Sequence, residues 1–229
     1  KNEFGYNYSF ENIFIGPGSK ELIFQLVYLL EGPLMVPAPS WVSYGPQAKI
    51  RSKPFIPITT DIKNGYRLQA AELDKTCSGE DSPQKILILN NPSNPTGSVH
   101  TPDELRALAE VCRKHGVIVI SDEIYAQTTY DFSKFVSMGK IYPEGTFVTN
   151  GLSKSHAAGG YRLGYVIFPQ HAVDLKAQFK KILATEYTAV STPIQYAAIP
   201  GFEISHEMDN YFKITRNIHK IMGEIGRAS

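Results

Sequence analysis

Residues 85–122 read KILILNNPSNPTGSVHTPDELRALAEVCRKHGVIVISD, and this stretch decides the fold. Two runs within it, Lys85–Asn90 and residues 117–120, are largely apolar, as is typical of strands that a sheet buries on both faces. The segment between them, Pro102–His115, is predicted to be a helix. A strand, a helix and a second strand in this order predict a parallel pair joined by a crossover helix.

The predicted helix carries its own start and stop signals. Thr101 precedes it as the N-cap, and Pro102 takes the first helical position, where a missing backbone N–H costs nothing. Glu104 completes a capping box with Thr101, and Gly116 ends the helix. We therefore expect these boundaries to follow from the local sequence alone.

The same alternation continues on both sides of this stretch. Further strands are predicted at residues 12–15, 33–36, Phe55–Thr59, 147–149 and 165–168, and further helices at residues 20–30, 171–189 and 211–225. The pattern predicts an α/β domain with a mostly parallel sheet. Asn90, Asp122 and the segment before Lys154 each follow a strand, and ligands of open α/β sheets bind at the carboxyl ends of the strands.

The composition is that of an ordinary soluble globular protein, with 42% hydrophobic and 20% charged residues among 229. The formal net charge is +1 and no long Lys/Arg run occurs, so neither nucleic acid nor an anionic membrane is indicated as a partner. No segment reaches the roughly 18 apolar residues of a membrane helix. No metal site is predicted. Cys112 is expected in the core, and its spacing from Cys77 does not favour a disulfide over two thiols.

The N-terminal sequence contains no signal peptide, which favours a cytoplasmic protein. The chain does not begin with Met, so we expect residues upstream of Lys1. An organelle presequence in that upstream part stays an open alternative.

Three motifs together supply an unusual set of chemical groups. They are Asn-Pro-Ser-Asn-Pro-Thr-Gly at residues 91–97, Ser-Asp-Glu-Ile-Tyr at residues 121–125, and the Ser/Gly-rich segment 149–165 around Lys154. They provide an amine for a Schiff base, a carboxylate for a ring nitrogen, donors for a phenolate oxygen and a cation for a phosphate. A pyridoxal phosphate enzyme needs this set.

These motifs, in this order and spacing over residues 16–169, resemble the class I/II aminotransferases, a fold-type-I family that uses pyridoxal 5'-phosphate. The resemblance implies a three-layer α/β/α large domain with a mostly parallel sheet. It also implies that residues 1–190 form this large domain without its N-terminal part. Residues 191–229 would be the linker and the start of a small domain that is largely absent.

The resemblance implies a catalytic role for three residues. Lys154 would carry the cofactor as an aldimine and then move a proton, which requires a lowered pKa. We expect burial and a neighbouring cation, such as Arg162 or the aldimine system, to lower that pKa. Asp122 would pair with the ring nitrogen, with Glu123 pointing to the opposite face. Tyr125 would donate to the phenolate oxygen, together with the amide of Asn94.

The phosphate is expected to be bound by two segments that are far apart in the sequence. Gly18, Ser19 and Lys20 open a helix, where free backbone amides favour an anion. Arg162 would add its planar guanidinium, and Ser153 a hydroxyl. Trp41 would stack on the cofactor ring. Some relatives have a serine three positions before the lysine. Gly151 stands there in this chain, so one phosphate hydrogen bond would be absent or replaced.

Each of these residues also has an ordinary structural interpretation. Asp122 alone reads as a cap of the next turn, Lys154 as a surface charge, and Tyr125 or Trp41 as core aromatics. The motifs occur together, and that favours the cofactor site.

The implied activity moves an amino group between an amino acid and a 2-oxo acid by a ping-pong route, in a homodimer. The family's arginine for the substrate carboxylate lies in the small domain and is not recognisable before Ser229. A carbon–sulfur lyase, an aminocyclopropane carboxylate synthase and a truncated chain that binds cofactor without turnover stay open as alternatives.

Overall fold

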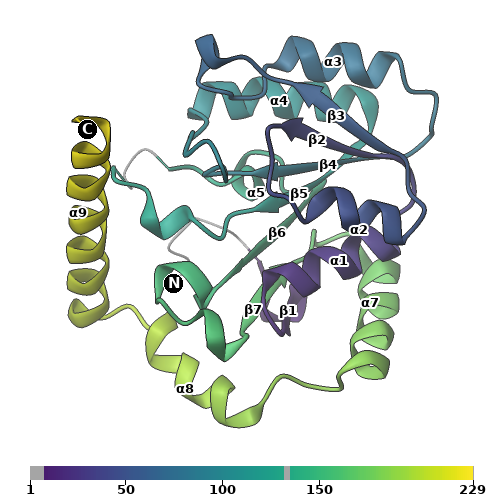
Figure 1. Cartoon of the computed structure of the whole chain (residues 1–229). Coiled ribbons are helices and arrows are strands. Elements are labelled where there is room, and N and C mark those ends of the chain that lie inside the picture. The colour runs from purple at the N-terminus through teal and green to yellow at the C-terminus, as the bar shows by residue number, and fades with distance from the viewer. Residues whose placement is uncertain (1–7, 132–134, 229) are drawn as a thin grey trace.

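The computed structural model describes residues 8–131 and 135–228, and its centre is a mostly parallel sheet (Figure 1). The spatial order of the seven strands is β1-β7-β6-β5-β4-β2-β3. In chain order they are β1 (Ile13–Gly16), β2 (Leu34–Ala38), β3 (Phe55–Thr59), β4 (Lys85–Asn90), β5 (Val117–Asp122), β6 (Thr146–Gly151) and β7 (Gly164–Ile167). Within this sheet β7 alone runs against its neighbours, since it pairs antiparallel with both β1 and β6.

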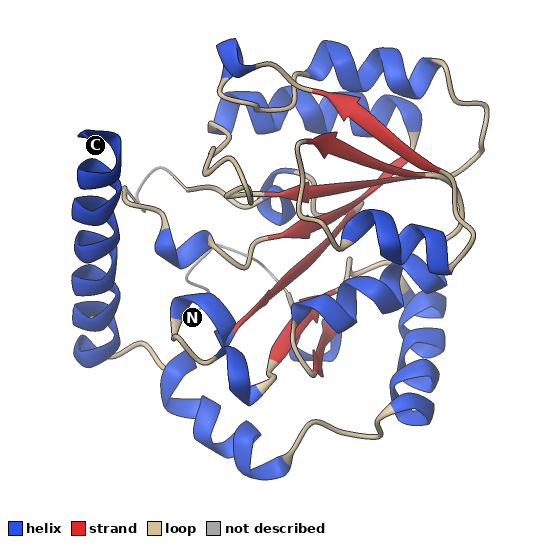
Figure 2. Ribbon diagram, viewed as in Figure 1, coloured by secondary structure: helices blue, strands red, loops and turns tan. Residues whose placement is uncertain are grey.

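Helices cover both faces of the sheet, which makes the predicted three layers (Figure 2). One face packs against α1 (Ser19–Leu29), α2 (Tyr44–Ile50) and α7 (Val173–Glu186). The other packs against α3 (Ala70–Ser78), α4 (Pro102–His115) and the short α5 (Met138–Ile141). The remaining helices are α6 (Leu152–Ser155), α8 (Thr192–Phe202) and α9 (His206–Ala228).

Strand β4 shows why its sequence is apolar without alternation. Ile86 and Ile88 pack into the core on the α1 side, whereas Leu87 and Leu89 pack into the core on the α4 side. Successive side chains of a strand point to opposite faces, so a sheet covered twice needs apolar residues at every position.

Local signals set the helix that the sequence predicts most clearly. Helix α4 has the bounds expected from its caps, and Thr101 and Glu104 form the reciprocal capping box. Gly116 ends it in the left-handed region, with a φ of 61°. Strands β3 and β4 also have the predicted bounds.

Several elements differ from the expectation. The predicted helix at residues 171–189 is shorter, since α7 ends at Glu186, and the one at residues 211–225 belongs to the longer α9. Helices α2, α3, α5, α6 and α8 have no counterpart in the predicted pattern. Helix α8 contains Pro193 in its first turn and Pro200 near its end, and such prolines read as loop signals in a sequence.

A row of glycines crosses the sheet where β1 and β6 end and β7 begins. Gly164 of β7 pairs with Gly16 of β1 on one side and with Gly151 of β6 on the other. A Cβ on Gly164 would lie 2.5 Å from the backbone nitrogen of Ser19. The missing side chains let the turn before α1 lie directly against the sheet edge.

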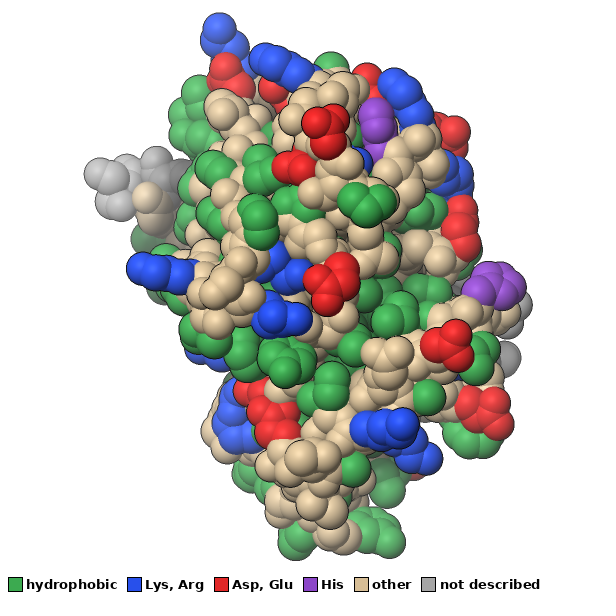
Figure 3. Space-filling model, turned by 90° about the vertical axis from the view of Figure 1, so that its right-hand side faces the viewer, with side chains coloured by type: hydrophobic (Ala, Val, Ile, Leu, Met, Phe, Trp, Pro, Cys, Tyr) green, Lys and Arg blue, Asp and Glu red, His purple; other side chains and the backbone are tan. Residues whose placement is uncertain are grey.

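Both cysteines are free and buried, and the core position expected for Cys112 is confirmed. Burial raises the pKa of Cys77 to about 11 and that of Cys112 to about 12. Within residues 8–131 and 135–228, no helix is both long and apolar enough to span a membrane. On the side of the molecule in Figure 3, Lys and Arg side chains are interspersed with Asp and Glu.

Candidate functional site

A cavity of about 500 Å³ lies at the carboxyl edge of the sheet. Of the ten residues predicted to bind the cofactor, nine line it. They are Ser19, Lys20, Trp41, Asn94, Asp122, Tyr125, Ser153, Lys154 and Arg162. The tenth, Gly18, lies directly behind the wall, where a Cβ would collide with the Arg162 guanidinium. The segments arrive from β1, β2, β4, β5, β6 and the start of β7, so the cavity depends on the whole sheet.

Asp122 ends β5 and is almost completely buried, at 3% exposure. Its Oδ2 accepts a hydrogen bond of 2.7 Å from the Tyr44 hydroxyl, and its Oδ1 accepts one of 3.4 Å from the Ile124 backbone N–H. Burial raises the pKa of Asp122 to about 6, and the hydrogen bonds from Tyr44 and Ile124 oppose that rise. The ionisation of this buried carboxyl group therefore depends on the hydrogen bonds that it accepts.

Glu123 points away from the cavity, to the opposite side of the strand end. Its Oε1 accepts hydrogen bonds from the hydroxyls of Ser121, at 2.8 Å, and Ser137, at 2.6 Å. Only the first of the two neighbouring acids lines the cavity, as the alternation of an extended segment predicts.

Asn94 and Tyr125 lie together, although 31 positions separate them. The Asn94 amide donates to the Tyr125 hydroxyl at 3.4 Å, and the Asn94 backbone N–H donates to the Asn90 side chain at 2.7 Å. Asn90 also donates to the backbone oxygen of Asp122 at 2.9 Å. Asn90 thus links the loop that carries Asn94 to Asp122 at the end of β5.

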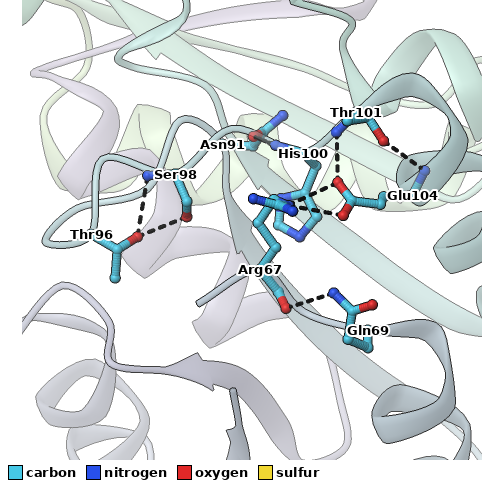
Figure 4. Close-up of polar contacts among 8 residues, drawn as sticks. All are labelled: Arg67, Gln69, Asn91, Thr96, Ser98, His100, Thr101 and Glu104. Atoms are coloured by element: carbon cyan, nitrogen blue, oxygen red, sulfur yellow. Dashed lines mark hydrogen bonds and ion pairs between the residues drawn. The ribbon is translucent and has the colours of Figure 1, made fainter. Parts of the chain in front are cut away.

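The loop of residues 91–101 has further internal supports, several of them visible in Figure 4. The Asn91 side chain accepts from the His100 backbone N–H at 3.0 Å, and the hydroxyls of Thr96 and Ser98 lie 2.8 Å apart. At its end, Arg67 makes a two-pronged ion pair with Glu104, at 2.8 and 3.0 Å. These contacts fix the loop that carries Asn94.

Lys154 lies on the single turn of α6, and its side chain is exposed rather than buried. The expected burial is therefore wrong for this chain. Its Nζ lies 5.8 Å from the centre of the Tyr125 ring. Lys154 also lines a second cavity, of about 1200 Å³, which extends to His219 and Met222 on α9. Lys154 thus contributes to the walls of both cavities.

The two segments predicted to bind phosphate are in contact. Arg162 donates to the backbone oxygen of Pro17 at 3.0 Å, across 145 positions of sequence, and to that of Gly159 at 2.8 Å. Gly18 has a φ of 97°, which only glycine adopts readily, before α1 begins at Ser19. Arg162 comes just before β7, and because β7 is reversed, its start lies at the same edge as the end of β1.

Trp41 and Lys20 form one wall of the cavity. The Lys20 amine lies 5.0 Å from the centre of the Trp41 ring, a cation–π contact. The Trp41 ring meets Tyr44 edge-on, with 5.3 Å between centres. Contacts with Lys20 and Tyr44 therefore fix the orientation of the Trp41 ring.

Gly151 has a packing reason that the sequence does not reveal. A Cβ there would lie 2.7 Å from the backbone oxygen of Leu163 and 2.8 Å from the Cα of Gly164. A serine does not fit at this position with the backbone as it stands, and the hydroxyl available nearby is that of Ser153.

Two residues that were not predicted as part of the site, Tyr44 and Asn90, also line the cavity. Their signals are visible afterwards, since Tyr44 follows Trp41 by three positions and Asn90 ends the apolar strand before Asn91. Among the described residues, no cluster of three or more His, Cys, Asp or Glu side chains is placed to hold a metal ion.

Comparison with known proteins gives the same family from sequence and from structure. A family model described as aminotransferase class I and II matches residues 4–224. An aspartate aminotransferase of Geobacillus stearothermophilus is 35% identical over 205 residues, which cover 86% of this chain and 50% of that protein. An asparagine–oxo-acid transaminase of Streptococcus mutans is 30% identical, with coverages of 86% and 50%.

Solved structures agree with the fold. An aspartate aminotransferase from Thermus thermophilus with maleate has a TM-score of 0.85 at 26% identity, and covers 94% of this chain and 56% of its own. An aromatic aminotransferase from Pyrococcus horikoshii has a TM-score of 0.83 at 27% identity, with coverages of 94% and 58%. The chain spans about half the length of the curated relatives it matches.

Proposed function

This chain belongs to the class I and II aminotransferase family, and from that membership and the cavity we propose that it is the cofactor-binding part of a pyridoxal-phosphate-dependent aminotransferase. The whole protein would move an amino group between an amino acid and a 2-oxo acid by a ping-pong route. Its substrates, and a homodimeric assembly, are parts of this proposal. Residues 191–229, with α8 and α9, would lead into the second domain.

One observation carries the proposal. A single cavity brings together a buried carboxylate, an exposed amine, an aromatic ring and a guanidinium, contributed by Asp122, Lys154, Trp41 and Arg162. The distances along the chain between these residues are large, so their meeting is a property of the fold. The set matches the parts of pyridoxal phosphate, which has an aldehyde, a ring nitrogen, a flat ring and a phosphate.

The residues present fit this cofactor. The phosphate would lie at the start of α1, against the Ser19 backbone and the Arg162 guanidinium. The bare Gly18 lets that guanidinium approach the turn, and the bare Gly164 lets Ser19 lie against the sheet. Trp41 would face the ring, and Asn94 and Tyr125 would donate to its phenolic oxygen. Asp122 would accept from the ring nitrogen, and Lys154 would anchor the aldehyde end.

Bound there, the cofactor supplies an electron sink for the charge left when the substrate Cα loses its proton. The chain's own residues would do the rest. Asp122 would keep the ring nitrogen protonated, because a buried carboxylate favours a cationic partner. The Lys154 amine would take up the proton from Cα and return it, since the exposed Lys154 lines both cavities.

Half-reactions test the proposal directly. The whole protein that contains this chain, loaded with pyridoxal phosphate, is mixed with an amino acid, and then with a 2-oxo acid. We expect the absorption band of the bound cofactor to be lost and then regained. Borohydride reduction before substrate should fix the cofactor on Lys154, as mapped by peptide mass spectrometry. A label on another lysine would contradict the site.

The same experiment separates the alternatives. A cofactor that binds and reacts with the amino acid, but is not regenerated by the 2-oxo acid, indicates another reaction of this scaffold. Binding with no exchange of the substrate Cα proton for deuterium indicates a chain that holds cofactor without turnover. Asp122→Ala should slow that exchange by about 10²- to 10⁴-fold while binding persists.

A further inference from the structure

Tyr44 is a buried residue to which the proposed chemistry assigns no role. It is the first residue of α2 and is 1% exposed. Its hydroxyl is 2.7 Å from the Asp122 Oδ2, much closer than the 3.4 Å that separates Oδ1 from the Ile124 nitrogen. The tyrosine therefore supplies the short hydrogen bond to this carboxylate.

The direction of that hydrogen bond is fixed by the surroundings. Burial, followed by the charge of Asp122, raises the pKa of Tyr44 well above its ordinary value. The hydroxyl thus keeps its proton at neutral pH and can only donate it to the carboxylate. A donor to the charged form favours ionisation, and here it counteracts the burial that otherwise favours the protonated acid.

Helix α2 also connects Tyr44 to the segment that carries Lys20, which lines the same cavity. One turn after Tyr44, the Gln47 amide donates to the backbone oxygen of Lys20 at 3.1 Å. Tyr44 also meets the Trp41 ring edge-on. Tyr44 is thereby held by α2 and by the ring wall, and its hydroxyl position is set before any ligand enters.

We propose that Tyr44 is a positioning residue for Asp122, which keeps the carboxylate charged and fixes one of its oxygens while the other remains able to accept from a cationic ring nitrogen. The inference rests on the proposed function, because that function gives Asp122 its partner. The other titratable groups that face Asp122 across the cavity are Lys20, Tyr125, Lys154 and Arg162. They stay in place in the variants below.

The contact can be tested without cofactor, by following the carboxyl carbon of Asp122 by NMR in the 229-residue chain as pH is varied. In Tyr44→Phe, which loses the donor and keeps the ring, we expect the midpoint to rise by about one to two pH units. Tyr142→Phe is the matched control. It removes another buried hydroxyl, bonded to the Val117 oxygen at 3.1 Å in the core on the other face of the sheet. An unchanged midpoint in Tyr44→Phe overturns the inference.

A second variant protects the test against a folding defect. Fluorotyrosine at position 44 keeps the shape and makes the hydroxyl a stronger donor, so the Asp122 midpoint should move down instead of up. Equal midpoints in the fluorinated and natural chains would refute the role, even if Tyr44→Phe does not fold.

The outcomes for Tyr44 and for the proposed function are separable. If the natural chain does not bind pyridoxal phosphate, the proposed function fails, whatever the Asp122 midpoint does. If it binds, the nitrogen-15 signal of the cofactor ring reports its protonation. We expect a more weakly protonated ring nitrogen in Tyr44→Phe than in Tyr142→Phe. Identical signals in the two variants would count against Tyr44 alone.

Discussion

Arg162 combines an unusual backbone with a well-placed side chain. Its φ is 53°, in the left-handed region that arginine seldom adopts, and its guanidinium donates to the carbonyls of Gly159 and Pro17. A guanidinium has five N–H donors, so donors remain for an anion beside the Ser19 turn. The residue that links two distant segments is thus also equipped to bind a phosphate.

We predict that Arg162→Ala weakens the binding of pyridoxal phosphate by about 10- to 150-fold, the loss of a charge-assisted hydrogen bond. Lys20→Ala should have a smaller effect, because the turn would bind through backbone amides and the Lys20 amine already lies over Trp41. Equilibrium dialysis at one salt concentration measures both dissociation constants. A larger loss in Lys20→Ala would show that the phosphate lies elsewhere.

At the scale of elements, the glycine row explains how the β1–β7–β6 edge carries the site. Gly164→Ala would push a methyl group against the Ser19 backbone, so we expect a destabilisation of about 1–3 kcal/mol. Gly160→Ala is the control, because no atom lies within 4 Å of its Cβ position. Urea unfolding measures both. Equal stabilities would mean that the turn before α1 does not press on β7.

A buried histidine, His100, lies at the end of the Asn94 loop, just before α4. Burial lowers the pKa of His100 from 6.5 to about 4, with Glu104 and Arg67 as the charged neighbours (Figure 4). Below pH 6.5 the unfolded chain binds a proton at His100, whereas the folded chain binds it only near pH 4. The contribution of the neutral, buried His100 to folding stability is therefore complete above pH 6.5 and is lost toward pH 4, by about 3 kcal/mol.

Asp122 acts in the opposite direction over nearly the same range. Its pKa is raised from 3.8 to about 6, so its burial costs stability as the pH rises between these values. The two effects largely cancel in the natural chain. We therefore expect His100→Phe to become more stable relative to the natural chain as the pH falls from 6.5 to 4, whereas the exposed His171→Phe should not. Parallel stability curves for His100→Phe and the natural chain would contradict the assignment.

What the sequence predicts best is local. The bounds of helix α4 can be predicted from its caps, and those of β4 from six consecutive residues, so neither prediction needs the rest of the chain. Tyr44 is different, because its role requires β5 to bring Asp122 within 2.7 Å, 78 positions away. The exposure of Lys154 likewise depends on how α9 and the loop of residues 91–101 lie around it. Such facts come from packing between distant segments, which no local pattern contains.

For the whole molecule, the cavity is a meeting point of strand ends, so it exists only when the sheet is complete. Its lining runs from Ser19 to Arg162, and the two ends of that span meet where Arg162 donates to the backbone oxygen of Pro17, at the proposed phosphate position. A ligand bound there must favour the folded chain over the unfolded one, because the unfolded chain cannot assemble these contacts.

Pyridoxal phosphate at 100 times its dissociation constant should therefore raise the free energy of unfolding by about 2.7 kcal/mol. Aldehydes also react with exposed lysines at random, and such adducts form on folded and unfolded chains alike, so they should give no comparable stabilisation. Pyridoxal without its phosphate is the matched ligand, since it keeps the aldehyde and loses the group that Arg162 and the Ser19 turn would hold. Urea unfolding with each compound measures the difference, and equal stabilisation by both would mean that the two distant segments do not act together on the phosphate.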